Sequence, residues 1–93
     1  MKFPPGQIVT TRAIHERRLE NVEFSRFVQL SITRHLEGDY GDISDADRVA
    51  NVNAENTEER ILSAYDFPGT KERIWIITEA DRSSTCVLFP DEY

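Results

Sequence analysis

The stretch that decides the fold of this chain is Ile74-Trp75-Ile76-Ile77-Thr78-Glu79-Ala80-Asp81-Arg82-Ser83-Ser84-Thr85-Cys86-Val87-Leu88-Phe89-Pro90. Two apolar runs, rich in β-branched and aromatic residues, flank a short polar cluster, which is the pattern of a β-hairpin. The run from Ile74 to Ile77 is apolar at every position, so we expect it to form a central strand that a helix covers.

Residues before the hairpin extend the predicted sheet. Residues 60–67 read as a strand, and Pro68-Gly69 turns the chain into the next strand, residues 72–78. With residues 85–89, these segments form an antiparallel meander. The short β-branched stretch Gln7–Thr10 is a candidate fourth strand.

Three helices are expected from their caps and apolar spacing. Thr11 can cap a short helix that runs to about Arg18, and a longer helix begins at Asn21 and ends before Gly38. Ser44 is the predicted cap of a third helix, residues 45–56, whose thin apolar side should cover one edge of the fold while its acidic residues face water. The predicted core is Phe24, Phe27, Val28, Ile32, Ile61, Ile74, Ile76 and Val87.

These elements predict a single α+β domain over residues 1–93. It has two layers, in which an antiparallel three- to four-stranded meander sheet packs against two or three helices. The length of 93 residues fits one domain with a small core.

The charges divide the chain into two parts. The full sequence carries 11 Lys and Arg against 17 Asp and Glu, a net charge of −6. Residues 1–38 hold six of the basic and four of the acidic side chains, and residues 39–93 hold five basic and thirteen acidic ones. Because net negative charge repels phosphates, nucleic-acid binding is not expected from the acidic part.

The sequence also favours a cytoplasmic protein. Its single cysteine, Cys86, excludes an internal disulfide. No apolar run is long enough to cross a bilayer, and residues 1–6 lack the apolar stretch of a signal peptide.

Several segments carry a family resemblance. They are Arg34–Asp42, Leu62–Tyr65, Ile74–Ser83 and Pro90–Tyr93, together with the opening residues 3–10. In this order they resemble a family of small uncharacterised bacterial proteins, often labelled plasmid-related and found on mobile elements. The family usually has tryptophan where this chain has Tyr40. The resemblance implies a plasmid or phage setting, in which small proteins often regulate or inhibit host defence.

Two clusters are candidate partner-binding sites. The first is the acidic segment from Asp39 to Glu59, which can face a basic protein surface, with Tyr40 as an anchor. The second is the polar tip of the hairpin. The candidate residues are Asp39, Tyr40, Asp42, Asp45, Asp47, Glu55, Glu58, Glu79, Asp81 and Arg82. The predicted function is a non-enzymatic, acidic protein-binding module of a mobile genetic element, such as an inhibitor of a host defence nuclease.

Two other functions remain open. A small hydrolase-type enzyme would use His35 with Asp39 and Asp42, or Glu79 with Asp81. These residues also suit a helix end and a turn, so we assign no catalytic residue, metal or cofactor. A nucleic-acid-binding regulator would use the basic side chains of the first part, which are also placed for surface ion pairs. A homodimer is compatible with either function. The basic side chains are Arg12, Arg17, Arg18, Arg26 and Arg34.

Overall fold

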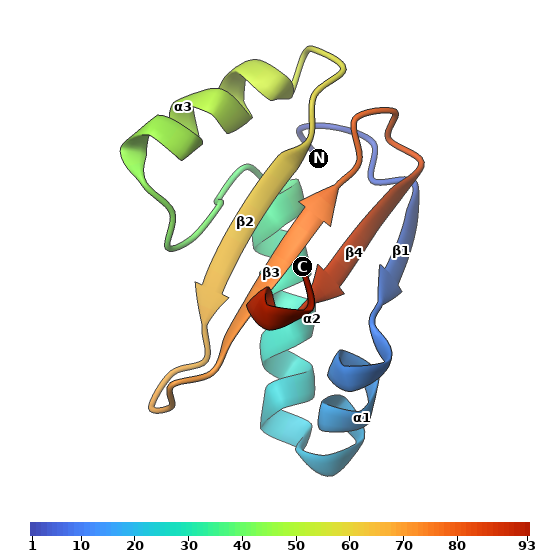
Figure 1. The fold of residues 1–93 in the computed structure, drawn as a ribbon, viewed down its shortest axis with the longest axis vertical. Coiled ribbons are helices and arrows are strands. Elements are labelled where there is room, and N and C mark those ends of the chain that lie inside the picture. Colours follow the sequence, from blue (N-terminus) through green and yellow to red (C-terminus); the bar gives the residue numbers. More distant parts are fainter.

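β3 (Arg73–Thr78) is the centre of a four-stranded sheet in the computed structural model, which describes residues 1–93. Its neighbours β2 (Ile61–Asp66) and β4 (Ser84–Leu88) are both antiparallel to it. The fourth strand, β1 (Gln7–Thr10), pairs with the free side of β4, so the strand order is β1-β4-β3-β2 (Figure 1). The predicted α+β class and the meander β2-β3-β4 are confirmed.

β1 runs parallel to β4, so the sheet is mixed and not antiparallel throughout as predicted. A tight hairpin imposes antiparallel pairing, whereas the long segment between β1 and β4 leaves the direction free. Contacts between the start of β1 and the tip of the β3–β4 hairpin, distant in sequence, set the strand direction instead. Gly6, with φ of 63°, lies so close to the hairpin tip that a Cβ atom would stand 2.3 Å from the Arg82 carbonyl oxygen. The next residue, Gln7, donates its N–H to the Ser83 carbonyl at 3.0 Å.

The helices begin at the residues that the sequence predicted. Thr11, Asn21 and Ser44 each accept the N–H of the third residue along, at 3.3, 3.1 and 3.1 Å. Gly38 follows the second helix with φ of 86°, a conformation that glycine adopts without strain. The elements are α1 (Arg12–Glu20), α2 (Val22–Leu36), α3 (Asp45–Ala54) and a short 3₁₀ turn, η1 (Pro90–Glu92).

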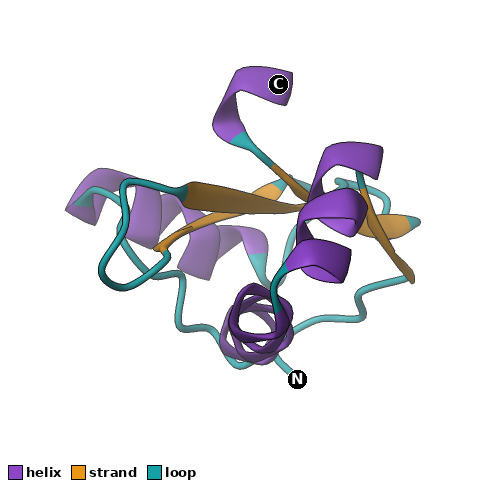
Figure 2. Ribbon diagram, turned by 90° about the horizontal axis from the view of Figure 1, so that it is seen from below, coloured by secondary structure: helices purple, strands orange, loops and turns teal.

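The sheet has one covered and one largely open face. α2 crosses the covered face, and the short η1 lies on the other (Figure 2). Six of the eight predicted core residues are fully buried between α2 and the sheet, while Phe27 and Ile32 are half-buried at its margin. No helix has the length and apolar character that crossing a membrane requires.

α3 covers an edge of the fold and keeps its acidic residues in water, as predicted, but most of its apolar side chains are exposed as well. Its buried residues are Asn51 and Ala54, whereas Val49 and Val52 are 61% and 51% exposed. The reason is the free edge of β2, which needs hydrogen-bond partners more than apolar contact. The Asn51 side chain donates to the Leu62 carbonyl at 2.7 Å and accepts the Leu62 N–H at 3.2 Å. This polar anchor turns the valines of α3 toward solvent.

Candidate functional site

The outer surface of α3 combines apolar and acidic side chains. Val49 and Val52 are one turn apart on the helix face that points away from β2, and Asp45 lies one turn before Val49 on the same face. Asp47, about 160° around the helix from Val49, and Glu58, four residues after the end of α3, are also exposed. We call the five residues Asp45, Asp47, Val49, Val52 and Glu58 the α3 surface.

The carboxylates of the α3 surface have no internal partner. The carboxylate oxygens of Asp45, Asp47 and Glu58 take part in none of the ion pairs or side-chain hydrogen bonds of the structure, and only the backbone N–H of Asp47 is bonded to a side chain, that of Ser44. Asp45 and Asp47 lie in the first turn of α3, where the helix dipole favours negative charge. These carboxylates therefore face solvent without a partner inside the protein.

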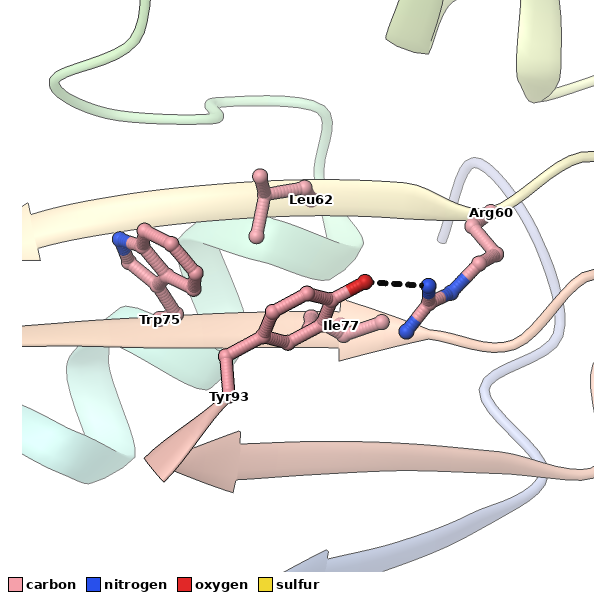
Figure 3. Close-up of a pocket in the computed structure, with 5 residues that line it drawn as sticks. All are labelled: Arg60, Leu62, Trp75, Ile77 and Tyr93. Atoms are coloured by element: carbon pink, nitrogen blue, oxygen red, sulfur yellow. Dashed lines mark hydrogen bonds between the residues drawn. The ribbon is translucent and has the colours of Figure 1, made fainter. Parts of the chain in front are cut away.

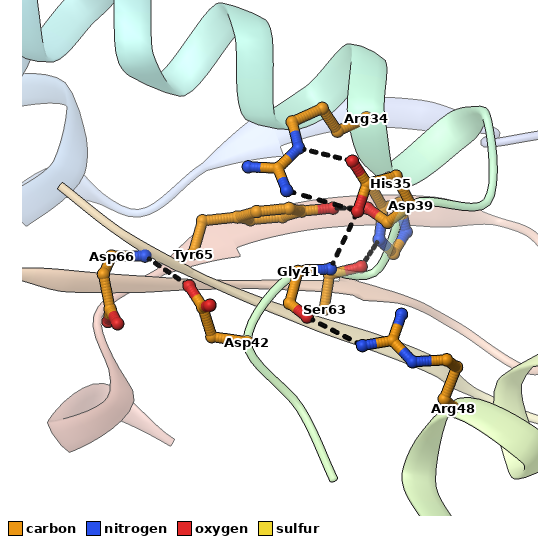
Figure 4. Close-up of polar contacts among 9 residues, drawn as sticks. All are labelled: Arg34, His35, Asp39, Gly41, Asp42, Arg48, Ser63, Tyr65 and Asp66. Carbon is orange, nitrogen blue, oxygen red and sulfur yellow. Dashed lines mark hydrogen bonds and ion pairs between the residues drawn. The ribbon is translucent and has the colours of Figure 1, made fainter. Parts of the chain in front are cut away.

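The remaining acidic candidates serve the protein itself. Asp39 pairs with Arg34 at 2.7 Å and accepts the Gly41 N–H, and the Arg34 guanidinium holds the pKa of Asp39 below its usual value (Figure 4). The Asp42 carboxylate accepts the Asp66 N–H at 3.2 Å. Asp39 thus holds the loop after α2 to Arg34 of that helix, and Asp42 holds the same loop to β2.

Tyr40 and Glu55 form a contact of their own. The Tyr40 side chain has no exposed surface, and its hydroxyl donates to Glu55 at 2.6 Å. Burial is the main reason that the pKa of this hydroxyl is raised, and the Glu55 carboxylate raises it further. Tyr40 is therefore part of the core in this structure, and Glu55 is the acceptor that burial of its hydroxyl requires.

At the hairpin tip, each candidate has a separate partner. Glu79 pairs with Arg60 at 3.2 Å, and Asp81 accepts the Ser83 N–H within the turn. Arg82, with φ of 60°, turns its guanidinium toward the end of α3 and donates to five backbone carbonyls. Three of these belong to residues 54, 57 and 59 and two to the tip itself. Arg82 thus caps the end of α3 from the hairpin tip.

His35 belongs to a buried polar chain that the sequence did not reveal. Its Nδ1 contacts the Ser63 hydroxyl, and its Nε2 lies 2.9 Å from Thr78 Oγ1. Thr78 lies 2.7 Å from Thr85, which donates to the carbonyl of Pro5 at 2.8 Å. We call these residues the His35 chain.

The directions within the His35 chain follow from its last member. The Pro5 carbonyl only accepts, so the Thr85 hydroxyl donates to it and accepts from Thr78. Thr78 then accepts from Nε2–H, and Nδ1 accepts from Ser63. Every buried side-chain polar atom is satisfied when His35 is neutral. Burial lowers the pKa of His35 to about 4, in agreement with the neutral form.

In the structure, His35, Asp39 and Asp42 do not come together as the carboxylate–histidine site that a small hydrolase would need. His35 is fully buried with both ring nitrogens bonded, while Asp39 and Asp42 bind Arg34 and the backbone of β2. No group of three His, Cys, Asp or Glu side chains is arranged to hold a metal ion. Ser63 and Thr78 occupy core-facing positions of otherwise apolar strands, and this was the signal that could have identified the His35 chain.

The open face of the sheet carries a shallow apolar groove of about 210 Å³. Arg60, Leu62, Trp75, Ile77 and Tyr93 line it (Figure 3). The Tyr93 ring lies edge-on to Trp75 at 5.7 Å between centroids, and its hydroxyl accepts a hydrogen bond from Arg60 at 2.7 Å. The groove therefore already holds an aromatic side chain of the protein.

The arginines of the first part are largely paired, as expected. Arg12 pairs with Glu16, Arg17 with Glu72 and Arg34 with Asp39. The Arg17–Glu72 pair is bidentate, with N–O distances of 2.9 and 2.6 Å, and fastens α1 to the turn before β3. These contacts use the basic side chains within the protein.

The chain matches no protein-family model, no curated protein and no solved structure. Its resemblance to the plasmid-related family therefore stays a prediction from the sequence.

Proposed function

We propose that the protein is a small, acidic protein-binding module whose contact site is the α3 surface. The observation that carries this proposal is the exposure of the apolar residues of α3. Val49 and Val52 are 61% and 51% exposed, the unpaired carboxylate of Asp45 lies one turn before Val49 on the same face, and the exposed carboxylates of Asp47 and Glu58 lie nearby in the chain. An apolar centre with a charged margin is the usual composition of a protein-binding patch.

The charge of the α3 surface selects the kind of partner. Three carboxylates without internal partners attract a basic groove, and the net charge of −6 adds to this attraction over longer distances. DNA-binding and RNA-cleaving proteins carry such grooves for phosphates. An inhibitor of a nuclease that occupies the groove is the specific form of this function that the plasmid or phage resemblance favours.

The test compares two variants with equal net charge. The α3 variant carries Asp45→Asn, Asp47→Asn and Glu58→Gln. The control variant carries Glu20→Gln, Glu23→Gln and Asp91→Asn, which are exposed carboxylates on other elements. Parent and variants serve as bait in a host lysate, and proteins captured by the parent and the control but lost by the α3 variant are then purified.

For such a partner, we expect the association rate to fall steeply with salt for the parent and the control. The rate should be lower and less salt-dependent for the α3 variant, because steering acts mainly on association. Equal rates for all three proteins at low salt would exclude the α3 surface as the binding site. A nuclease partner should lose activity on addition of the parent and keep it on addition of the α3 variant.

A further inference from the structure

We infer that β1 is a self-association site, at which a second copy of this chain adds its own β1 in antiparallel direction. The two strands would join the two sheets into one of eight strands. The site is separate from the α3 surface, which lies beyond the opposite edge of the sheet (Figure 1). The inference rests on the backbone of β1, the exposure of its side chains and the state of the other edge.

β1 leaves backbone groups without partners. Gln7 and Thr11 donate to Ser83 and Val87 of the β4 side, so the odd-numbered residues bond inward in the parallel ladder. The N–H and C=O groups of Ile8 and Thr10 therefore point away from the sheet. No backbone hydrogen bond in the structure outside the regular elements reaches either residue.

The side chains of β1 do not protect this edge. Ile8 and Val9 are 46% and 36% exposed, and the strand contains no charged residue and no proline. Proteins usually block a free edge with lysine, proline, a bulge or a covering segment. β1 has none of these within its four residues, so it favours pairing with another strand.

The edge of β2 is closed by three different groups. The Asn51 amide binds both backbone groups of Leu62, and the backbone of residues 40–42 pairs with Ala64 at 3.2 and 2.7 Å. The carboxylate of Asp42, in the same segment, accepts the N–H of Asp66. Each copy thus has one open edge, so self-pairing consumes both open edges and stops at two chains, whereas two open edges would allow a filament.

The hydrogen-bond pattern determines the register of the pair. Because Ile8 and Thr10 point outward, Ile8 of one copy pairs with Thr10 of the other, and the two-fold axis passes between the two Val9 residues. This register uses all four outward groups of each strand. Other antiparallel registers leave Ile8 or Thr10 without a partner.

Side chains of opposite charge lie at the two ends of β1. The exposed Asp81 lies in the hairpin tip beside Gly6, at the start of β1, and Arg12, which is exposed and paired with Glu16 of the same helix, follows its end. Antiparallel pairing brings the Arg12 end of one copy to the Asp81 end of the other. The contact is short, so we expect a weak dimer that forms at high protein concentration.

The first test measures association. Sedimentation of the parent from about 10 µM to about 1 mM should show a shift from monomer to dimer and no larger species. Ile8→Pro removes an outward N–H and no bond to β4, so it should abolish the shift. The control Leu30→Gln removes an apolar side chain of α2 that is 62% exposed, and this variant should still shift from monomer to dimer. A parent that stays monomeric throughout would overturn the inference.

The second test checks the register and does not depend on the proline variant. Residues that face each other across a non-hydrogen-bonded antiparallel pair have Cα atoms about 4.5 Å apart, within the range of a disulfide. Val9→Cys in a Cys86→Ser background should therefore form a covalent dimer on mild oxidation. The control Gln7→Cys in the same background lies on the same face but away from the axis. Equal dimer yields from the two variants would contradict the proposed pairing.

Discussion

Two regions of the molecule depart from the usual distribution of polar and apolar residues. The interface between α2 and the sheet buries polar side chains, whereas the outer surface of α3 exposes apolar ones. In the interface, His35 and its hydroxyl partners are buried and every side-chain polar atom is bonded. On α3, valines are exposed and carboxylates have no partner. The difference shows which polar residues hold the fold and which are free to act outside it.

The largest expected effect is in the interface. His35→Ala leaves a cavity and removes the partners of the buried Ser63 and Thr78 hydroxyls. We expect a loss of about 3–5 kcal/mol in the free energy of unfolding, measured by urea denaturation. A loss below about 1 kcal/mol would show that water replaces the imidazole and that the His35 chain is not a structural feature.

Arg82→Ala should have the next largest effect. The variant loses five hydrogen bonds from a charged donor, three of them to carbonyls of the last residue of α3 and of the loop before β2. Because Arg82 is half-buried and water can replace part of these contacts, we expect a cost of about 2–3 kcal/mol by urea denaturation. Arg82→Lys tests the geometry, since an ammonium group cannot reach both sets of carbonyls, and should recover less than half of the loss.

Acid should weaken the interface between α2 and the sheet through His35. The pKa of His35 is about 4 in the folded protein, and an unfolded histidine titrates near 6.5. The unfolded chain therefore binds more protons as the pH falls below 6.5, and stability decreases toward pH 4. We expect a loss of about 2 kcal/mol between pH 6.5 and pH 5. His35→Gln, if folded, should show a much smaller loss over this range, and an equal loss would assign the effect to other groups.

The smallest effect on stability is expected on α3. Asp45→Asn with Val49→Ser removes one favourable dipole interaction and an exposed apolar side chain, which should change the free energy of unfolding by less than about 1 kcal/mol. Thermal denaturation of this variant beside His35→Ala tests the comparison directly. A large loss for the α3 variant would mean that Val49 packs within the fold.

The sequence predicted the fold well because its local signals agree with the long-range packing. Three helix caps, the glycine after α2 and the apolar run of β3 each report on a single element. The direction of β1 was not predictable, because it depends on a contact between Gly6 and the distant hairpin tip. The exposure of Val49 and Val52 was not predictable for a related reason: the hydrogen bonds from Asn51 to Leu62 of β2 decide which face of α3 meets the sheet.

For the candidate site, composition located the acidic segment but could not separate its members. Asp39, Asp42 and Glu55 resemble Asp45 and Asp47 in sequence, yet the first three bind Arg34, the backbone of β2 and Tyr40. Such pairings join residues from different elements, and periodicity within one element carries no information about them. Only the structure shows which carboxylates remain available.

The parallel pairing of β1 with β4 also bears on how the chain folds. The hydrogen bond from Thr85 to Pro5 joins residues 80 positions apart, whereas β2, β3 and β4 are consecutive in the chain. Contacts of long sequence separation form slowly because the closing loop loses entropy before they form. We therefore expect the meander with α2 to form first and β1 to add last. On the ribosome, β1 cannot take its place until the residues of β4 have been synthesised.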